Sequence, residues 1–264
     1  MGSAWQDIKA LHEASTRGAK EGFAFRYFSR PLASFILYYI QHGSLTPNQI
    51  TILSLLVATV GFGVNMFVLP WWGLILGAAL FMAAHVLDAL DGQLARHRKA
   101  GSTIGMHFDF FIDEIKAYFL YLAIAIRLYL QAGSGTGSWT LNFLLKHIDR
   151  SLIFWWALAG FCGLSIGISC TKFIKMPSWI EAFPAGAGGA KPSGLGALIA
   201  LVEKVGRFVI DYPSYIVFVS IANFVEGYFA VYTVVVVLYA IRALFTISRK
   251  LWAVNPYKKT ESKA

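Results

Sequence analysis

The sequence predicts an all-α membrane protein with six transmembrane helices and an N-terminal amphipathic interfacial helix. Three observations lead to this fold class. The 264 residues are 57% hydrophobic and only 14% charged, and their mean hydropathy is +0.58. Apolar runs of about 20 residues recur along the chain, which is the length that a helix needs to cross a bilayer. The Lys and Arg residues gather between these runs.

The chain opens with a polar arm, residues 1–45, which is expected to lie in the cytosol. The apolar stretch 32–40 within this arm is too short to cross the bilayer, so we expect a helix that lies on the membrane surface. Thr46 is suited to cap a following helix, and Pro47 suits its first position. These two residues therefore predict the start of the first span, about 47–68.

Five further spans are expected after the first. The segment 209–247 is too long for one span and is predicted to fold into two, broken near Glu226–Gly227. A long loop, 172–207, precedes it and contains the Gly- and Pro-rich run 184–192. The other three spans are predicted at about 71–91, 103–131 and 152–171. The resulting organisation is the arm, a six-helix transmembrane domain and a cytosolic tail, with boundaries 1–45, 46–248 and 249–264.

The distribution of positive charge predicts the orientation of these spans. Nineteen of the 23 Lys and Arg residues fall on the side of the two termini, and only Lys146 and Arg150 fall on the opposite side. Because cytosolic loops carry the excess of Lys and Arg, both termini and the loop 96–101 are predicted to face the cytosol. The net charge of +9 is therefore expected to meet anionic membrane lipid, and no nucleic acid.

Carboxylates stand at fixed offsets where the second and third spans meet. The chain reads Asp88-x-x-Asp91-Gly92-x-x-Ala95-Arg96, then eight residues, then Gly105-x-x-x-Asp109-x-x-x-Asp113. Each half places its carboxylates on one helix face. Two antiparallel helix ends would then hold four carboxylates in a small volume, where they repel one another unless cations neutralise them. Hard divalent cations with oxygen ligands, Mg²⁺ or Mn²⁺, suit this requirement.

This motif resembles, without a single departure, the signature of the CDP-alcohol phosphotransferases, membrane enzymes that build phospholipid head groups. The resemblance implies transfer of a substituted phosphate group from a CDP-linked donor to an alcohol acceptor, with release of CMP, in phospholipid biosynthesis. The donor is CDP-diacylglycerol in one half of the family and a soluble CDP-alcohol in the other, and the sequence does not choose between them. The six-helix domain would then be the catalytic one.

The chemistry assigns roles to the motif residues. Two Mg²⁺ or Mn²⁺ ions held by shared carboxylates would neutralise a diphosphate and align a hydroxyl. Asp88, Asp91 and Asp109 are the expected permanent ligands, and the resemblance assigns Asp113 to deprotonating the acceptor while it contacts a metal ion. Glycines would let a nucleotide approach the backbone, and an arginine would bond a phosphate or brace a carboxylate. The nucleotide-binding candidates in the motif are Gly92, Ala95, Arg96 and Gly105.

Three residues outside the motif are also candidates. Asn48 lies in a stretch that resembles the start of the first span in this family, where it would line the nucleotide pocket or cap the helix. Lys116 lies one turn beyond Asp113, where it would bind the acceptor or pair with Glu114 or another acid. Arg127 is about four turns beyond Asp113, so we expect its side chain to snorkel to the far interface.

Two other functions for the carboxylates stay open from the residues alone. An intramembrane prenyltransferase also binds a diphosphate through Mg²⁺ and aspartates, and a cation transporter also places carboxylates in the membrane. The transporter interpretation lacks support, because the sequence shows no interrupted helices at matching positions in two halves of the chain. The expected location is a bacterial or archaeal plasma membrane with the active site facing the cytosol, and whether the chain forms a homodimer stays open.

Overall fold

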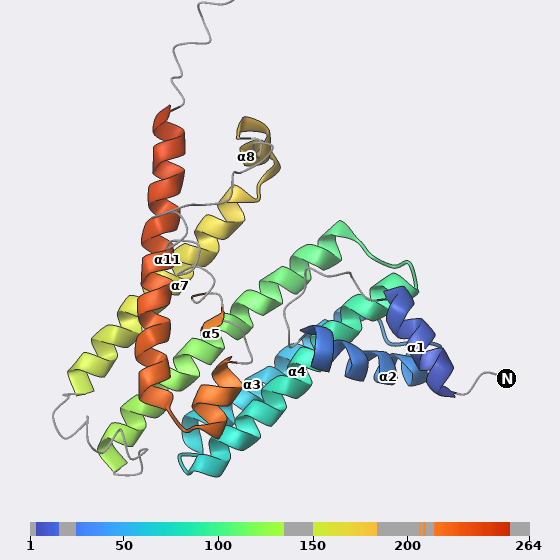
Figure 1. Ribbon diagram of the computed structural model, residues 1–264, viewed down its shortest axis with the longest axis horizontal. Helices are drawn as coiled ribbons and strands as arrows, with labels where there is room; N and C mark the ends of the chain where they lie inside the picture. Colours follow the sequence, from blue (N-terminus) through green and yellow to red (C-terminus); the bar gives the residue numbers. More distant parts are fainter. Residues whose placement is uncertain are drawn as a thin grey trace, which may run out of the picture.

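The computed structural model describes residues 4–15, 25–134, 150–183, 206, 208–209 and 214–253, and in these ranges every regular element is a helix (Figure 1). Within this part of the chain, five helices are long and apolar enough to cross a membrane. They are α3 (Pro47–Phe67), α4 (Trp71–His97), α5 (Thr103–Ser134), α7 (Arg150–Ile174) and α11 (Val225–Ala253). The all-α membrane class is therefore confirmed.

The start of α3 follows the prediction. The Thr46 hydroxyl accepts a hydrogen bond from the backbone N–H of Gln49 at 3.3 Å, and the Gln49 side chain accepts one from the N–H of Thr46 at 2.8 Å. This reciprocal pair satisfies two backbone donors that the helix leaves free, and Pro47 occupies a position where no N–H is needed. The polar residues before the first span therefore set where it begins.

The later boundaries differ from the prediction in two places. Helix α4 continues to His97, so the whole first half of the aspartate motif is helical. The break expected near Glu226–Gly227 lies earlier, because Glu226 already belongs to the first turn of α11. The π-helix η2 (Tyr215–Ile221) precedes the break, and Asn223 turns the chain with a φ of 52°, a left-handed conformation that Asn tolerates better than most residues.

The predicted fifth span, before residue 226, falls only partly on the residues described. The run 184–192 lies outside them, as do residues 254–264 of the predicted tail 249–264. The loop 172–207 contains one described helix after α7, the short α8 (Pro177–Ala182).

Small residues let the long helices pack closely. Helices α3 and α4 are antiparallel, and a Cβ atom added to Gly61 would lie 3.1 Å from the Leu80 side chain. A Cβ atom at Gly77 would collide with the side chain of Asn65. Close backbone approach through glycine is a common way to associate helices in a membrane. The register of α3 on α4 is therefore tightly constrained.

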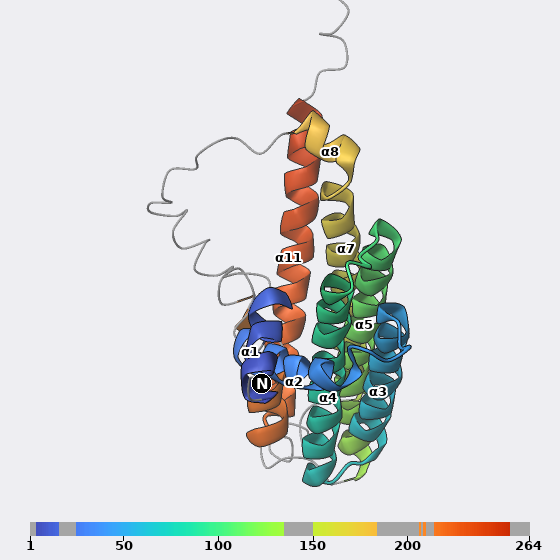
Figure 2. The same ribbon diagram turned by 90° about the vertical axis from the view of Figure 1, so that its right-hand side faces the viewer.

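Helices α7 and α11 run in the same direction side by side (Figures 1 and 2). A Cβ atom at Gly160 would meet Thr233, and one turn later a Cβ atom at Gly163 would lie 3.0 Å from Cα of Val237. The pairing advances along both helices together, so the two helices are parallel. Their apolar faces join α5 and η2 in the largest core cluster of the described chain.

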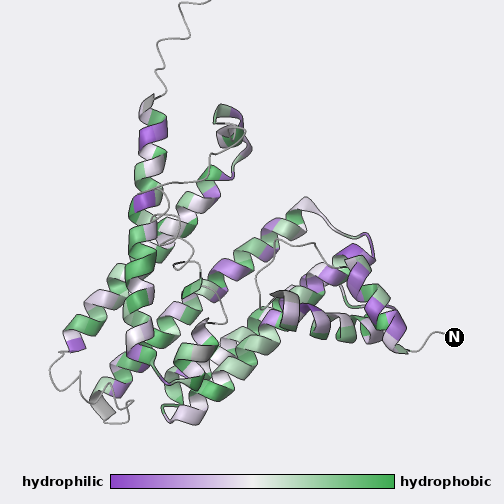
Figure 3. Cartoon of the chain, in the orientation of Figure 1, coloured by the Kyte–Doolittle hydropathy of each residue, from purple (hydrophilic) through white to green (hydrophobic). Residues whose placement is uncertain are grey.

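The N-terminal arm packs against the motif end of α4. It contains α1 (Ala4–Ser15), the π-helix η1 (Phe25–Ser29) and α2 (Arg30–Ile40). Helix α2 lies crosswise to the long helices (Figure 2), and its Leu37 is buried in a cluster with Leu94 of α4. Hydrophobic residues dominate the middle of the long helices, whereas α1 carries many hydrophilic ones (Figure 3). A position of α2 on the membrane surface stays a prediction.

The prediction for Arg127 is wrong. Its side chain is only 1% exposed, and its guanidinium donates hydrogen bonds to four carbonyls at the end of α3 and in the turn that follows. The acceptors are Asn65 O at 3.0 Å, Val68 O at 2.8 Å, Leu69 O and Pro70 O at 3.2 Å. The last carbonyls of a helix have no donor within the helix. Arg127 supplies those donors from α5, so it does not snorkel.

Candidate active site

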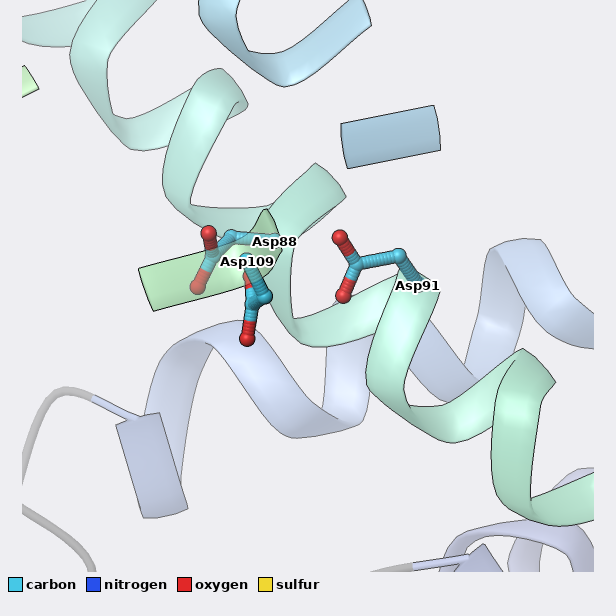
Figure 4. Close-up of side chains that lie close together, drawn as sticks. All are labelled: Asp88, Asp91 and Asp109. Carbon is cyan, nitrogen blue, oxygen red and sulfur yellow. The ribbon is translucent and has the colours of Figure 1, made fainter. Parts of the chain in front are cut away.

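Three aspartates from two helices converge at the motif end of the bundle. Asp88 and Asp91 lie on α4, and Asp109 lies on α5. One carboxylate oxygen from each lies within 4.8 Å of the other two. Figure 4 shows the Asp91 carboxylate directed toward the pair formed by Asp88 and Asp109. The antiparallel arrangement of α4 and α5 therefore unites the two halves of the motif, as the sequence predicted.

These three residues fit a hard divalent cation. Every donor in the group is a carboxylate oxygen, which is the ligand type that Mg²⁺ and Mn²⁺ prefer. The cluster is also poorly hydrated, because Asp91 is 5% exposed and the side chain of Asp88 is 10% exposed. Carboxylates this close and this buried repel one another strongly unless positive charge lies between them. The arrangement can therefore hold a divalent ion against a phosphate group.

Thr51 supports the cluster from a third helix, and our sequence reasoning did not include it. Its hydroxyl lies on α3, is 3% exposed, and donates a hydrogen bond to Oδ2 of Asp91. The Thr51 hydroxyl oxygen also lies 3.1 Å from the carbonyl oxygen of Pro47. A hydrogen bond of this kind fixes the orientation of a carboxylate that binds metal. The sequence did not single out Thr51, because the same span also contains the polar residues Ser54, Thr59 and Asn65.

Lys116 forms ion pairs with two of the four motif aspartates. Its ammonium Nζ lies 2.6 Å from Oδ1 of Asp88 and 3.2 Å from Oδ1 of Asp113. The Lys116 side chain is 14% exposed, whereas that of Asp113 is 48% exposed. Glu114, the other partner considered for Lys116, pairs with Lys172 at 2.5 Å. The structure therefore places Lys116 inside the acidic cluster, and it places Asp113 at the accessible edge.

Asp113 borders the three converging aspartates at their exposed edge. The group of oxygens within 4.8 Å of one another consists of Asp88, Asp91 and Asp109 among the residues described. Asp113 lies one turn beyond Asp109 on α5, and its carboxylate interacts directly with that of Asp88. The ammonium of Lys116 contacts both carboxylates. Its role as base and metal ligand stays a prediction.

Four of the five predicted nucleotide-binding residues lie in two neighbouring pairs. A Cβ atom on Gly105 would lie 3.5 Å from Oδ1 of Asn48, so these two candidates are neighbours. A Cβ atom on Gly92 would lie 3.3 Å from the guanidinium of Arg96, and Nε of Arg96 donates a 2.5 Å hydrogen bond to the carbonyl of Ser15. Ala95 is half-buried on α4. Nucleotide contacts by these residues stay predictions.

Comparison with known proteins gives the same answer as the motif. A family model described as CDP-alcohol phosphatidyltransferase matches residues 44–207. That range contains the three converging aspartates, Asp113, Lys116 and Thr51.

Three relatives illustrate the range of similar proteins. The bifunctional IPC transferase and DIPP synthase of Archaeoglobus fulgidus is 30% identical over 138 residues, which are 48% of this chain and 27% of that protein. The chloroplastic/mitochondrial CDP-diacylglycerol–glycerol-3-phosphate 3-phosphatidyltransferase 1 of Arabidopsis thaliana is 29% identical over 118 residues, 43% of this chain and 38% of that one. Cholinephosphotransferase 1 of Gallus gallus is 43% identical over 61 residues, 22% and 18% of the two chains. The match to the first of these relatives spans about a quarter of its length.

Proposed function

Because this chain belongs to the CDP-alcohol phosphatidyltransferase family, we propose that it transfers a substituted phosphate group from a CDP-linked donor to an alcohol and releases CMP. The observation that carries the proposal is the convergence of Asp88, Asp91 and Asp109 within 4.8 Å. A diphosphate needs concentrated positive charge in order to react, and three buried carboxylates recruit that charge. The family match leaves no support for the prenyltransferase and cation-transporter alternatives.

In this proposal, three of the motif carboxylates bind metal ions and the fourth accepts a proton. Asp88, Asp91 and Asp109 would hold divalent ions, with Asp91 oriented by Thr51. When bound, two Mg²⁺ or Mn²⁺ ions neutralise the diphosphate and favour ionisation of the acceptor hydroxyl. Asn48, Gly105, Gly92, Ala95 and Arg96 would surround the nucleotide.

Asp113 is the proposed proton acceptor, because its side chain is the exposed member of the motif. The acceptor oxygen forms a bond to the phosphorus distal to the cytidine, and the bond from that phosphorus to the CMP oxygen breaks. The hydroxyl proton passes to Asp113. A carboxylate is a weak base, but a hydroxyl beside divalent ions needs only a weak one.

We place the reaction at the cytosolic face of a bacterial or archaeal plasma membrane. The excess of Lys and Arg on the side of the motif supports this orientation. The parallel packing of α7 and α11 supports six crossings, because the chain leaves α7 at one end of the bundle and enters α11 at the other. We therefore infer a return across the membrane between Ile174 and Val225, which would keep both termini on the motif side.

The substrate pair is left to experiment, because the relatives carry names with different substrates. Purified protein is incubated with CDP-diacylglycerol and polar alcohols in one arm, and with soluble CDP-alcohols and lipid acceptors in the other. CMP release and mass spectrometry of the lipids identify the productive pair. We expect CMP release to stop in EDTA and to return with Mg²⁺ or Mn²⁺. Full turnover in chelator would refute the metal-dependent reaction, and no CMP release with any pair would refute the proposed transfer.

A further inference from the structure

We propose that Lys116 acts as a built-in cation that competes with the second divalent ion, so that this ion enters the site only together with the nucleotide. The inference rests on the proposed function, which it deepens by assigning an order of binding. It follows from the position of one ammonium group between two carboxylates of the motif.

The geometry puts Lys116 where a second ion would need ligands. Its Nζ contacts Oδ1 of Asp88 at 2.6 Å and Oδ1 of Asp113 at 3.2 Å, and so bridges α5 to α4. These are hydrogen-bond distances for an ammonium and a carboxylate. A divalent ion that shared Asp88 and Asp113 would have to displace this ammonium. One oxygen from each of Asp88, Asp91 and Asp109 lies within 4.8 Å of the other two, so these three residues offer one site for a cation.

The balance of charge leads to the same order. The four aspartates carry a formal charge of −4, and Lys116 reduces it to −3. One divalent ion leaves a charge of −1, whereas a second would make the free site positive while Lys116 stays in place. The diphosphate of a CDP-linked substrate brings further negative charge and oxygen ligands. The second ion is therefore favoured once the nucleotide is present.

Burial makes this competition strong. The side chains of Lys116 and Asp88 are 14% and 10% exposed, respectively. Charges this close and this poorly hydrated interact more strongly than a pair on the surface. Lys172 provides a matched comparison on the same side of the bundle, because it pairs with Glu114, one residue from Asp113, but its side chain is 55% exposed.

The test counts bound Mn²⁺ by the electron paramagnetic resonance signal of the free ion, on the full chain in detergent. We expect wild type to bind one Mn²⁺ tightly, and two when CMP is added. Lys116→Met should bind two Mn²⁺ without CMP, with an affinity for the second ion that rises about tenfold or more, the scale on which neighbours of metal ligands act. Lys116→Arg should resemble wild type because it keeps the charge, and Lys172→Met should resemble it because the cluster is untouched.

Lys116→Gln is measured beside Lys116→Met, so that a folding defect in one variant does not decide the result. Two equal Mn²⁺ sites in the free wild type, or the same Mn²⁺ binding in wild type and in both neutral variants, would overturn the inference and leave the proposed function standing. An equal rise in the affinity of Lys172→Met for the second Mn²⁺ would also overturn the inference, because the effect would then come from removing any positive charge near the site. No Mn²⁺ binding in any variant would overturn both the inference and the metal dependence of the proposed reaction.

Discussion

Replacing Arg127 with Met should strongly destabilise the protein. The substitution keeps an apolar stem of similar length in α5 but removes the guanidinium that satisfies the carbonyls at the end of α3. Hydrogen bonds to a charged group contribute about 1.5–3 kcal/mol each. The contacts to Asn65 O at 3.0 Å and Val68 O at 2.8 Å alone therefore give about 3–6 kcal/mol. Arg127 is 1% exposed, so water cannot readily take over this role.

The assay is thermal unfolding of the purified protein in one detergent, followed by tryptophan fluorescence. At roughly 2–4 °C per kcal/mol for a chain of this size, the midpoint of Arg127→Met should fall by about 6–24 °C. The midpoint of Arg127→Lys should fall by less, because an ammonium can donate hydrogen bonds to some of the four carbonyls but not in the fork geometry of a guanidinium.

Arg150→Met is the matched control. Arg150 is exposed, and its guanidinium stacks 5.5 Å from the ring of Tyr129, also on α5. An exposed contact of this kind is worth about 0.5–1 kcal/mol, so the midpoint should fall by less than about 4 °C. A shift of Arg127→Met no larger than that of Arg150→Met would refute the assignment of Arg127 as the donor that completes the end of α3.

Three further predictions address the site and its orientation. Asp113→Asn should lower turnover by about 10²–10⁴-fold with only a modest loss of CMP affinity in Mg²⁺, whereas Asp91→Asn should lose both turnover and CMP affinity. Calorimetric titration with CMP, run beside a CMP-release assay, distinguishes the two variants, and an equal loss of CMP affinity in both would make Asp113 mainly a metal ligand. Thr51→Val should weaken Mn²⁺ binding by roughly 10–100-fold while Thr51→Ser keeps it, and unchanged binding in Thr51→Val would show that the hydroxyl does not orient Asp91. Ala100→Cys, in a background with the exposed Cys162 replaced by Ala, should react with an impermeant maleimide only from the cytosolic side, and labelling of intact cells would place the motif on the wrong face for CDP-linked substrates.

The sequence determined the local features of this protein. Thr46 and Pro47 set the start of α3, because a helix end is decided by a few neighbouring residues. The spacing of Asp88, Asp91 and Asp109 placed them on faces that could meet, because a helix has a fixed period. The long apolar runs identified the spans, because the backbone must satisfy its own hydrogen bonds in lipid.

Only the tertiary structure decided which polar groups pair across helices. The partners of Arg127 are 57–62 residues away in sequence, Thr51 and Asp91 are 40 apart, and Lys116 and Asp88 are 28 apart. Such pairs depend on the axial register between neighbouring helices, and apolar periodicity leaves that register undetermined because a slide of one turn preserves the buried face. Here the register of α3 on α4 depends on contacts such as that of Gly77 with Asn65. Close contacts between neighbouring helices therefore determine which charged and polar groups pair, and the sequence alone does not.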